Sequence, residues 1–179
     1  MIVDERLVTY INSLDTGNTE ILDQIEKEAI AAYVPIIRKE MQSFLKLLLA
    51  MQKPMRILEV GTAVGFSAIL MAQYAPADCK IVTIENYEKR IPVAKENFKR
   101  AGKDEQITLL EGDAMQILPT LSGEFDMIFM DAAKGQYINF MPDILRLLKS
   151  GGVLVSDNVL QDGDIIESHY VVERRNRTI

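Results

Sequence analysis

Residues 56–65 read RILEVGTAVG, and this stretch decides the fold. A largely apolar run, residues 57–60, leads into two glycines four positions apart, Gly61 and Gly65, and a helical pattern begins at once with Phe66. A strand, a glycine turn and a helix in this order bring bare backbone close to a bound nucleotide, because glycine has no Cβ to block the approach. We therefore predict a nucleotide-binding turn here.

Downstream of this turn, short β-rich runs alternate with helical runs, which predicts βαβ units and a Rossmann-like, doubly wound, mainly parallel α/β sheet. Upstream, apolar residues recur every three or four positions, which predicts three helices. We expect one domain, residues 1–179, with a helical N-terminal extension (1–54) and a Rossmann-like core (55–179). The expected strands are 56–60, 80–84, 107–111, 126–130 and 153–156, and the expected helices are 4–14, 20–33, 37–51, 66–73, 90–100, 114–121 and 137–149.

The composition excludes several classes of protein. The 179 residues carry a net charge of −6, which argues against a surface built to bind nucleic-acid phosphates. No apolar run approaches the roughly 20 residues of a membrane-spanning helix, and the N-terminus lacks the apolar core of a secretory signal. A single cysteine, Cys79, allows no internal disulfide. We expect a cytoplasmic protein with no membrane partner.

Acidic residues follow almost every predicted strand. Ligands of an open parallel sheet bind beyond the carboxyl ends of the strands, so these side chains are predicted to share one rim. Any one of them, Asp113 for example, is equally well explained as a helix cap or turn residue, but five together are more than loops require. The five are Glu59, Glu85, Asp113, Asp131 and Asp157, the last followed by Asn158.

Glu85 lies about twenty residues beyond the glycine turn, where a carboxylate accepts hydrogen bonds from both hydroxyls of a ribose. The glycine pattern is G-x-x-x-G instead of G-x-G-x-x-G, which disfavours a dinucleotide with its two phosphates. An adenosine with an amino-acid tail is the better ligand, and S-adenosylmethionine is such a molecule. Glu59 and Gly61 are then predicted to face its ammonium and carboxylate groups.

Asp131, Asp157 and Asn158 form a second group. Two carboxylates and an amide oxygen from neighbouring strands suit Mg²⁺, with waters or substrate completing six ligands. Lys134, three residues past Asp131, is predicted to reach the same space. A nearby divalent cation disfavours the charged form of a lysine, so that it can act as a base. Taken alone, Lys134 fits a surface lysine better.

Four segments carry a resemblance to a known family: LEVGTAVGFSA, IVTIEN, FDMIFMDAAK and GGVLVSDNV, in this order. They resemble the cation-dependent O-methyltransferases of the catechol and caffeoyl-CoA type, over about residues 34–158. The N-terminal helices and VPIIRKE, residues 34–40, look closest to the bacterial tRNA 5-hydroxyuridine methyltransferases. The resemblance implies S-adenosylmethionine, Mg²⁺ or a similar divalent cation, and a homodimer.

The resemblance also implies a role for each matching residue. It assigns cofactor binding to Ile36, Glu59, Gly61, Ser67, Glu85, Asp113, Ala114 and Asp131; metal binding to Asp131, Asp157 and Asn158; and catalysis to Lys134, as the base, and Asp131. The family sheet ends with a further strand hairpin, whereas this sequence stops at Ile179 within a helical pattern. We therefore expect the core to be incomplete at its C-terminus. His169 lies in this last stretch, and we assign it no catalysis.

The expected reaction is methyl transfer from S-adenosylmethionine to a hydroxyl with a vicinal oxygen, Lys134 taking the hydroxyl proton. The first expected substrate is 5-hydroxyuridine in the tRNA anticodon, giving 5-methoxyuridine. The basic residues Arg174, Arg175 and Arg177 favour tRNA, while the acidic net charge does not. The alternative is a catechol-like or caffeoyl-CoA-like molecule. A non-catalytic nucleotide-binding module and a nicotinamide-dependent oxidoreductase are more remote alternatives.

Overall fold

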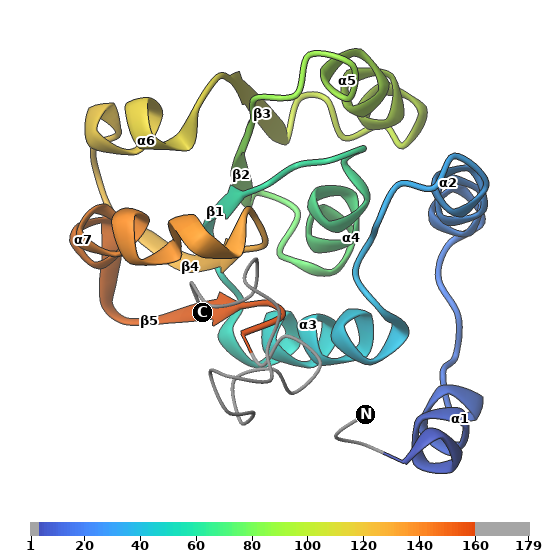
Figure 1. Cartoon of the computed structure of the whole chain (residues 1–179). Helices are drawn as coiled ribbons and strands as arrows, with labels where there is room; N and C mark the ends of the chain where they lie inside the picture. Colours follow the sequence, from blue (N-terminus) through green and yellow to red (C-terminus); the bar gives the residue numbers. More distant parts are fainter. Residues whose placement is uncertain (1–3, 160–179) are drawn as a thin grey trace, which may run out of the picture.

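The computed structural model describes residues 4–159. At its centre lies a sheet of five parallel strands in the order β3-β2-β1-β4-β5 (Figure 1). The strands are β1 (Arg56–Val60), β2 (Lys80–Glu85), β3 (Ile107–Glu111), β4 (Phe125–Met130) and β5 (Leu148–Ser156). The chain builds outward from β1 through β2 to β3, then returns to add β4 and β5 on the other side of β1. This confirms the predicted doubly wound α/β sheet.

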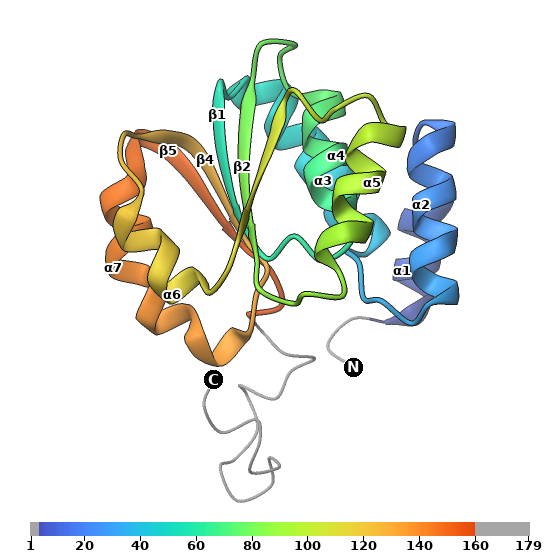
Figure 2. The same ribbon diagram turned by 90° about the horizontal axis from the view of Figure 1, so that it is seen from above.

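Helices cover both faces of the sheet (Figure 2). One face carries α2 (Glu20–Ala31), α3 (Lys39–Gln52), α4 (Phe66–Tyr74) and α5 (Ile91–Arg100), and the other carries α6 (Ala114–Ile117), η1 (Leu118–Thr120) and α7 (Tyr137–Leu147). Successive strand residues point to opposite layers, so Ile57 packs with the first group and Leu58 with the second. α1 (Glu5–Ser13) buries no residue. Within residues 4–159, no helix has the length and apolarity needed to span a bilayer.

The third helix begins two residues later than predicted. α3 starts at Lys39, because Arg38 is extended, with φ −67° and ψ 160°. Residues 35–38 have no regular secondary structure and end in this extended residue, and we call them the extended segment.

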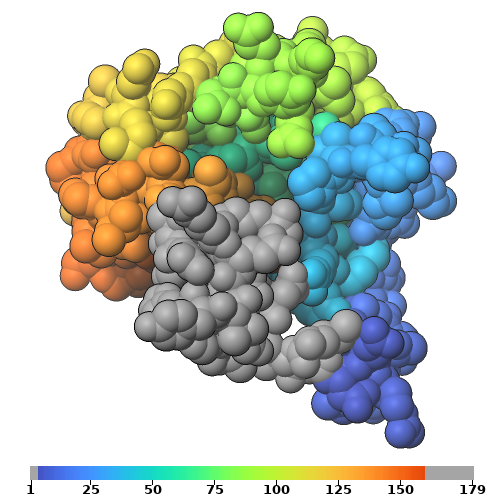
Figure 3. All heavy atoms as spheres, viewed as in Figure 1, coloured from blue at the N-terminus to red at the C-terminus, as the bar shows by residue number. Residues whose placement is uncertain are grey.

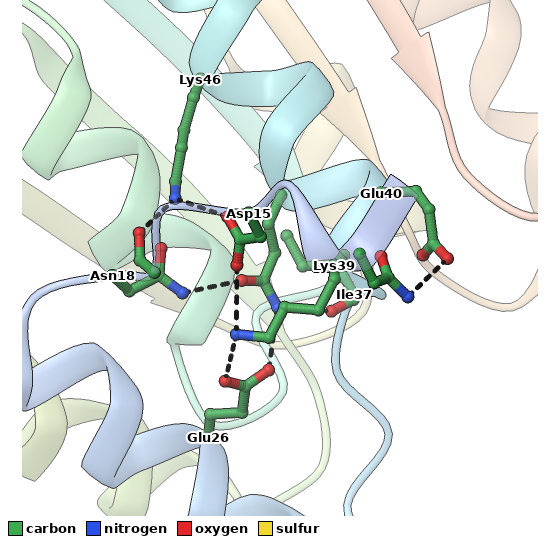
Figure 4. Close-up of polar contacts among 10 residues, drawn as sticks. Asp15, Asn18, Glu26, Ile37, Lys39, Glu40 and Lys46 are labelled. Carbon is green, nitrogen blue, oxygen red and sulfur yellow. Dashed lines mark hydrogen bonds and ion pairs between the residues drawn. The ribbon is translucent and has the colours of Figure 1, made fainter. Parts of the chain in front are cut away.

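A polar network holds this extended segment against the N-terminal helices (Figure 4). The amide of Gln42, 1% exposed, donates to the Ile37 carbonyl at 3.1 Å and to Glu26 at 3.0 Å, and accepts from Asn18 at 2.8 Å. Lys39 donates to Glu26 at 2.7 Å. Since buried polar groups are costly unless they are paired, this network fixes the path of the segment.

The last strand begins five residues earlier than predicted. Leu148 pairs with Phe125 and Val153 with Met127, so residues 149–152 of β5 lie opposite Asp126 alone. The Gly151-Gly152 pair, which suggests a turn, instead lies inside this bulge. A Cβ on Gly152 would lie 2.9 Å from the Lys149 carbonyl oxygen, which is closer than side chains approach.

The predicted helix 114–121 is also divided, into α6 and the 3₁₀ turn η1, because Pro119 has no N–H to continue the α-helical bonding. The other predicted elements agree to within two residues. The expectations for the missing hairpin, His169 and the basic cluster 174–177 lie outside the described residues.

Asp126 joins three strands at the amino end of the sheet. Its carboxylate accepts hydrogen bonds from the backbone N–H of Met55 at 2.9 Å, from that of Arg56 at 3.0 Å, and from Lys149 Nζ at 2.9 Å. The Lys149 hydrogen bond is the main cause that lowers the pKa of Asp126, with the two backbone donors adding to it against the effect of burial.

We expect Asp126→Ala to lower the free energy of unfolding by about 1–3 kcal/mol, because it removes these hydrogen bonds together. Since the folded-state pKa of Asp126 is lowered, its contribution is present above the ordinary aspartate pKa and is lost as the pH falls through the lowered value. Urea unfolding at pH 7 and in acid measures this. The control Asp143→Ala removes a surface pair with Arg146 and should cost less than about 1 kcal/mol. A loss of unfolding free energy in Asp126→Ala that is larger in acid than at pH 7 would contradict this role of the ionised Asp126 carboxylate.

Candidate active site

A cavity of about 1350 Å³ lies beyond the carboxyl ends of the strands. Turns after all five strands line it, together with the extended segment 35–38 and two residues of α1. In Figure 3 the surface is hollowed between α5 in green, α2 in light blue and α7 in orange. Four of the five acids of the predicted rim, Glu85, Asp113, Asp131 and Asp157, line this one space, whereas Glu59 does not.

The glycine turn after β1 forms one wall of the cavity. Gly61 has φ +107°, and the N–H groups of Gly61 and Thr62 both donate to the Ile84 carbonyl at 3.1 Å. A Cβ on Gly61 would lie 2.1 Å from the Asp131 carbonyl oxygen, and a Cβ on Gly65 would lie 2.5 Å from the Phe98 ring. Both glycines are thus required by close packing as well as by backbone conformation.

Glu85 is held rigidly at the end of β2. Its carboxylate accepts hydrogen bonds from the backbone N–H groups of Ala63 at 2.7 Å, Tyr87 at 2.8 Å and Asn86 at 3.1 Å. It lines the cavity and is only 8% exposed. The donor from Ala63 also ties the glycine turn to β2, so a ligand hydroxyl would meet a carboxylate that is already oriented.

Glu59 lies beneath the cavity and does not line it. It is fully buried and accepts hydrogen bonds from the hydroxyls of Ser67 and Thr83, each at 2.5 Å. Burial raises the pKa of Glu59 to about 8 despite these two donors. Ser67 does line the cavity. The structure therefore places Glu59 as a support for Ser67, one layer below its predicted contact with the ligand.

The remaining predicted cofactor residues lie on the cavity wall. Ile36 comes from the extended segment, and Asp113 and Ala114 from the turn after β3. The Asp113 carboxylate also accepts a hydrogen bond from the Met115 N–H at 2.9 Å, so it caps α6. The helix-cap explanation of Asp113 is therefore correct, and the residue lines the cavity as well.

Asp131 and Lys134 meet at the end of β4. The distance from Lys134 Nζ to Asp131 Oδ1 is 2.5 Å, and both residues line the cavity. Burial of Lys134 opposes its charged form, but the hydrogen bond and the charge of Asp131 outweigh it and raise the pKa of Lys134. Lys134 is thus part of the site and not an isolated surface lysine.

Asp157 and Asn158 follow β5 on the same wall. Burial, and next the negative charge of Asp131, raise the pKa of Asp157, while the Asn158 N–H at 2.8 Å, Lys134 and Arg38 act in the opposite direction. Among residues 4–159, no three His, Cys, Asp or Glu side chains are grouped to hold a metal ion. The set of Asp131, Asp157 and Asn158 has two carboxylates and one amide. Two carboxylates close enough to repel one another, beside an amide oxygen, fit a hard cation such as Mg²⁺.

A relay of hydrogen bonds connects the N-terminal extension to the glycine turn. Glu28 of α2 accepts two hydrogen bonds from Arg100 of α5, at 2.7 and 2.8 Å. Arg100 donates to Asn97 at 2.9 Å, and buried Asn97 donates to the Val64 carbonyl at 2.9 Å. The turn is therefore supported from outside the sheet.

Four residues with a place in this site are absent from the predictions: Arg38, Thr83, Asn97 and Tyr137. The sequence does give a signal for Thr83, because Thr83 and Glu59 are polar residues that each interrupt an apolar strand. In the structure the two residues pair in register. Asn97 and Arg38 have no such signal, because their partners lie far away in the sequence. Tyr137 follows Lys134 at a spacing of three residues, which places it on the same side of a helical turn.

The fold and the cavity define a Rossmann-like α/β protein with an acidic, oxygen-rich ligand site. Residues 12–179 match the O-methyltransferase family, and the chain belongs to this family.

The sequence is similar to two bacterial catechol O-methyltransferases. It is 39% identical to that of Niastella koreensis over 70% of this chain and 59% of the relative, and 35% identical to that of Mycobacterium tuberculosis over 88% and 73%. The structure is similar to an O-methyltransferase from Bacillus cereus solved with SAH, with TM-score 0.80 and 29% identity over 88% of this chain and 74% of the other. It is also similar to an O-methyltransferase from Streptomyces achromogenes solved with SAM, with TM-score 0.83 and 30% identity over 96% and 81%. The chain thus spans about three fifths of the length of the first of these relatives.

The contact between Gly61 and Asp131 can be tested with a matched pair of variants. Gly61 and Gly102 both have positive φ, +107° and +62°, but a Cβ on Gly102 would meet nothing within 4 Å. We expect Gly102→Ala to lower the free energy of unfolding by about 1 kcal/mol, from backbone strain alone. Gly61→Ala should cost about 2–4 kcal/mol, because overpacking is added to strain. Equal losses in urea unfolding would show that the close approach has no effect.

Proposed function

We propose that this chain transfers a methyl group from S-adenosylmethionine to a hydroxyl that has a second oxygen beside it, with Mg²⁺ or a similar divalent cation. One observation carries the proposal: a single cavity joins the glycine turn and Glu85 to Asp131, Lys134 and the Asp157–Asn158 pair. Relatives named O-methyltransferase, and neighbours solved with SAM or SAH, support it.

The cofactor half of the cavity fits S-adenosylmethionine. Gly61 lets the backbone approach the amino-acid end, where Ser67, supported by Glu59, also lies on the wall. Glu85, with its oxygens oriented by three N–H groups, accepts hydrogen bonds from the ribose hydroxyls. Ala114 and Asp113 line the part of the cavity that is left for the adenine, and Ile36 lines the part near the mouth.

The acidic half sets the chemistry. A divalent cation held by Asp131, Asp157 and Asn158 would supply the Lewis acidity that lowers the pKa of the acceptor hydroxyl. The pair with Asp131 favours the ammonium form of Lys134, and a divalent cation on that carboxylate would weaken the pair and favour the neutral amine that can act as a base. Lys134 Nζ then takes the hydroxyl proton, and the acceptor oxygen forms its bond to the methyl carbon as the carbon–sulfur bond breaks.

We infer that the acceptor is a small catechol-like or caffeoyl-CoA-like molecule, because the relatives carry those names. Two oxygens on neighbouring carbons suit the oxygen-rich wall. The second candidate is 5-hydroxyuridine in a tRNA anticodon, which presents a similar pair through its 5-hydroxyl and O4. One observation favours it: the segment VPIIRKE, which carries the resemblance to the tRNA enzymes, lines the cavity through residues 35–38 and Glu40.

Methyl-labelled S-adenosylmethionine, offered with Mg²⁺ to a catechol panel and in parallel to tRNA from cells that cannot methylate hydroxyuridine, tests the proposal. We expect transfer to a catechol, and its loss on addition of a chelator. Lys134→Met should lower the rate about 10²–10⁴-fold, as for removal of a general base. Asp131→Asn should abolish transfer, whereas Asp143→Asn on the surface of α7 should not change it.

Full activity in chelator would contradict the cation role, and full activity of Asp131→Asn would refute catalysis at this centre. Transfer to tRNA with a KM that rises steeply with salt would replace the small molecule by the second candidate. A KM for tRNA that is independent of salt would count against tRNA as the substrate.

The homodimer implied by the family resemblance is a further part of the proposal. The exposed apolar residues of α1 and its C-cap support it, since Leu7, Tyr10 and Ile11 of α1 and the C-cap Leu14 are 48–63% exposed. We expect light scattering to give twice the mass of the chain. The mass of a single chain at micromolar concentration would contradict a stable dimer.

A further inference from the structure

Tyr137, the first residue of α7, bridges the ends of β4 and β5. Its hydroxyl donates to the Met130 carbonyl at 2.9 Å and lies 3.3 Å from the Asp157 carbonyl oxygen. The backbone N–H of Asp157 donates to the same Met130 carbonyl at 3.0 Å. The hydroxyl and this N–H thus continue the connection between the two strands beyond their last paired residues, Met130 and Ser156.

The bridged residues are those that carry the acidic half of the cavity. Asp131 follows Met130 directly, and Asn158 follows Asp157. The separation of the two carboxylates therefore depends on how the two strand ends are joined. Tyr137 itself is not among the residues that line the cavity, so it acts through its neighbours.

The ring of Tyr137 has a second contact in the same site. Lys134 Nζ lies 5.4 Å from the centroid of the ring, within the range of a cation–π interaction. One side chain thus contacts the backbone that carries the carboxylates and also the lysine that pairs with Asp131.

We propose that Tyr137 is a positioning residue for the oxygen set: its hydroxyl fixes the turns that present Asp131, Asp157 and Asn158, and its ring orients Lys134. This inference rests on the proposed cation site. The two parts of the side chain can be tested separately: Tyr137→Phe removes the hydroxyl, including its interaction with Lys134, and keeps the ring, whereas Tyr137→Leu removes both.

The test measures Mn²⁺ binding to the full chain by electron paramagnetic resonance, and methyl transfer as a function of Mg²⁺ concentration. We expect Tyr137→Phe to raise the Kd for Mn²⁺ by about threefold to tenfold, which is the effect of losing one hydrogen bond. The Mg²⁺ concentration that gives the half-maximal rate should rise by the same factor. The rate at saturating Mg²⁺ should fall less than about threefold. Tyr137→Leu should also lower the saturated rate, by about tenfold or more, since Lys134 loses the ring beneath it.

Binding of S-adenosylhomocysteine, measured by calorimetry without metal, should be unchanged in both variants, because the three N–H groups that orient Glu85 come from the turns after β1 and β2 and not from the strand ends that Tyr137 joins. Tyr74→Phe is the matched control, since the Lys46 ammonium lies 5.1 Å from the centroid of that ring, away from the cavity. It should leave all three measurements unchanged.

Unaltered Mn²⁺ affinity in Tyr137→Phe, with normal binding in the wild type, would overturn this inference alone. Parallel losses of Mn²⁺ and S-adenosylhomocysteine binding with a lower unfolding midpoint would also overturn it, because they would show a general structural role. A wild-type chain that binds no Mn²⁺ would instead refute the proposed cation site, and the role of Tyr137 with it.

Discussion

The close approach of Gly61 to the Asp131 carbonyl is the constraint on which the rest of the site depends. A single added carbon would stand 2.1 Å from that oxygen, so the turn after β1 and the turn after β4 fit together only through a glycine. This contact lies where the order of the strands reverses, between β1 and β4. The half of the cavity suited to a nucleoside and the half rich in carboxylates thus share one wall.

Four of the acids that follow or end the strands are each held by a different set of donors, three at the rim and Glu59 beneath it. Two hydroxyls bond Glu59, three backbone N–H groups orient Glu85, Lys134 pairs with Asp131, and the N–H of Asn158 bonds Asp157. Burying carboxylates without such partners would be costly. Acids that merely solvated loops would not need them, and this distinguishes a built site from a run of acidic turns.

The order of strands and helices and the shared rim could be predicted from the sequence, because apolar periodicity and glycine spacing are local signals. The start of α3 and the bulge in β5 were missed for one reason. Both depend on contacts with distant segments: the Ile37 carbonyl with Gln42 and its network, and Gly152 with the backbone of β4. Asn97 and Tyr137 were missed likewise, since their partners belong to other elements. We predicted that Glu59 is a neighbour of the ligand. Its burial was missed because it depends on Thr83, which belongs to the neighbouring strand β2.

The pairing of β1 with β4 also has a consequence for the order of folding. Met55 and Asp126, hydrogen-bonded across these strands, are 71 positions apart, whereas β1, β2 and β3 follow one another closely in the chain. During synthesis the first three strands emerge together, and one edge of β1 stays open until β4 has left the ribosome. Closing so long a loop costs entropy that only the completed sheet centre recovers. The acidic half of the cavity, and the wall that Gly61 shares with Asp131, therefore form only when β4 has paired with β1, and a partly folded chain lacks the lysine–carboxylate pair.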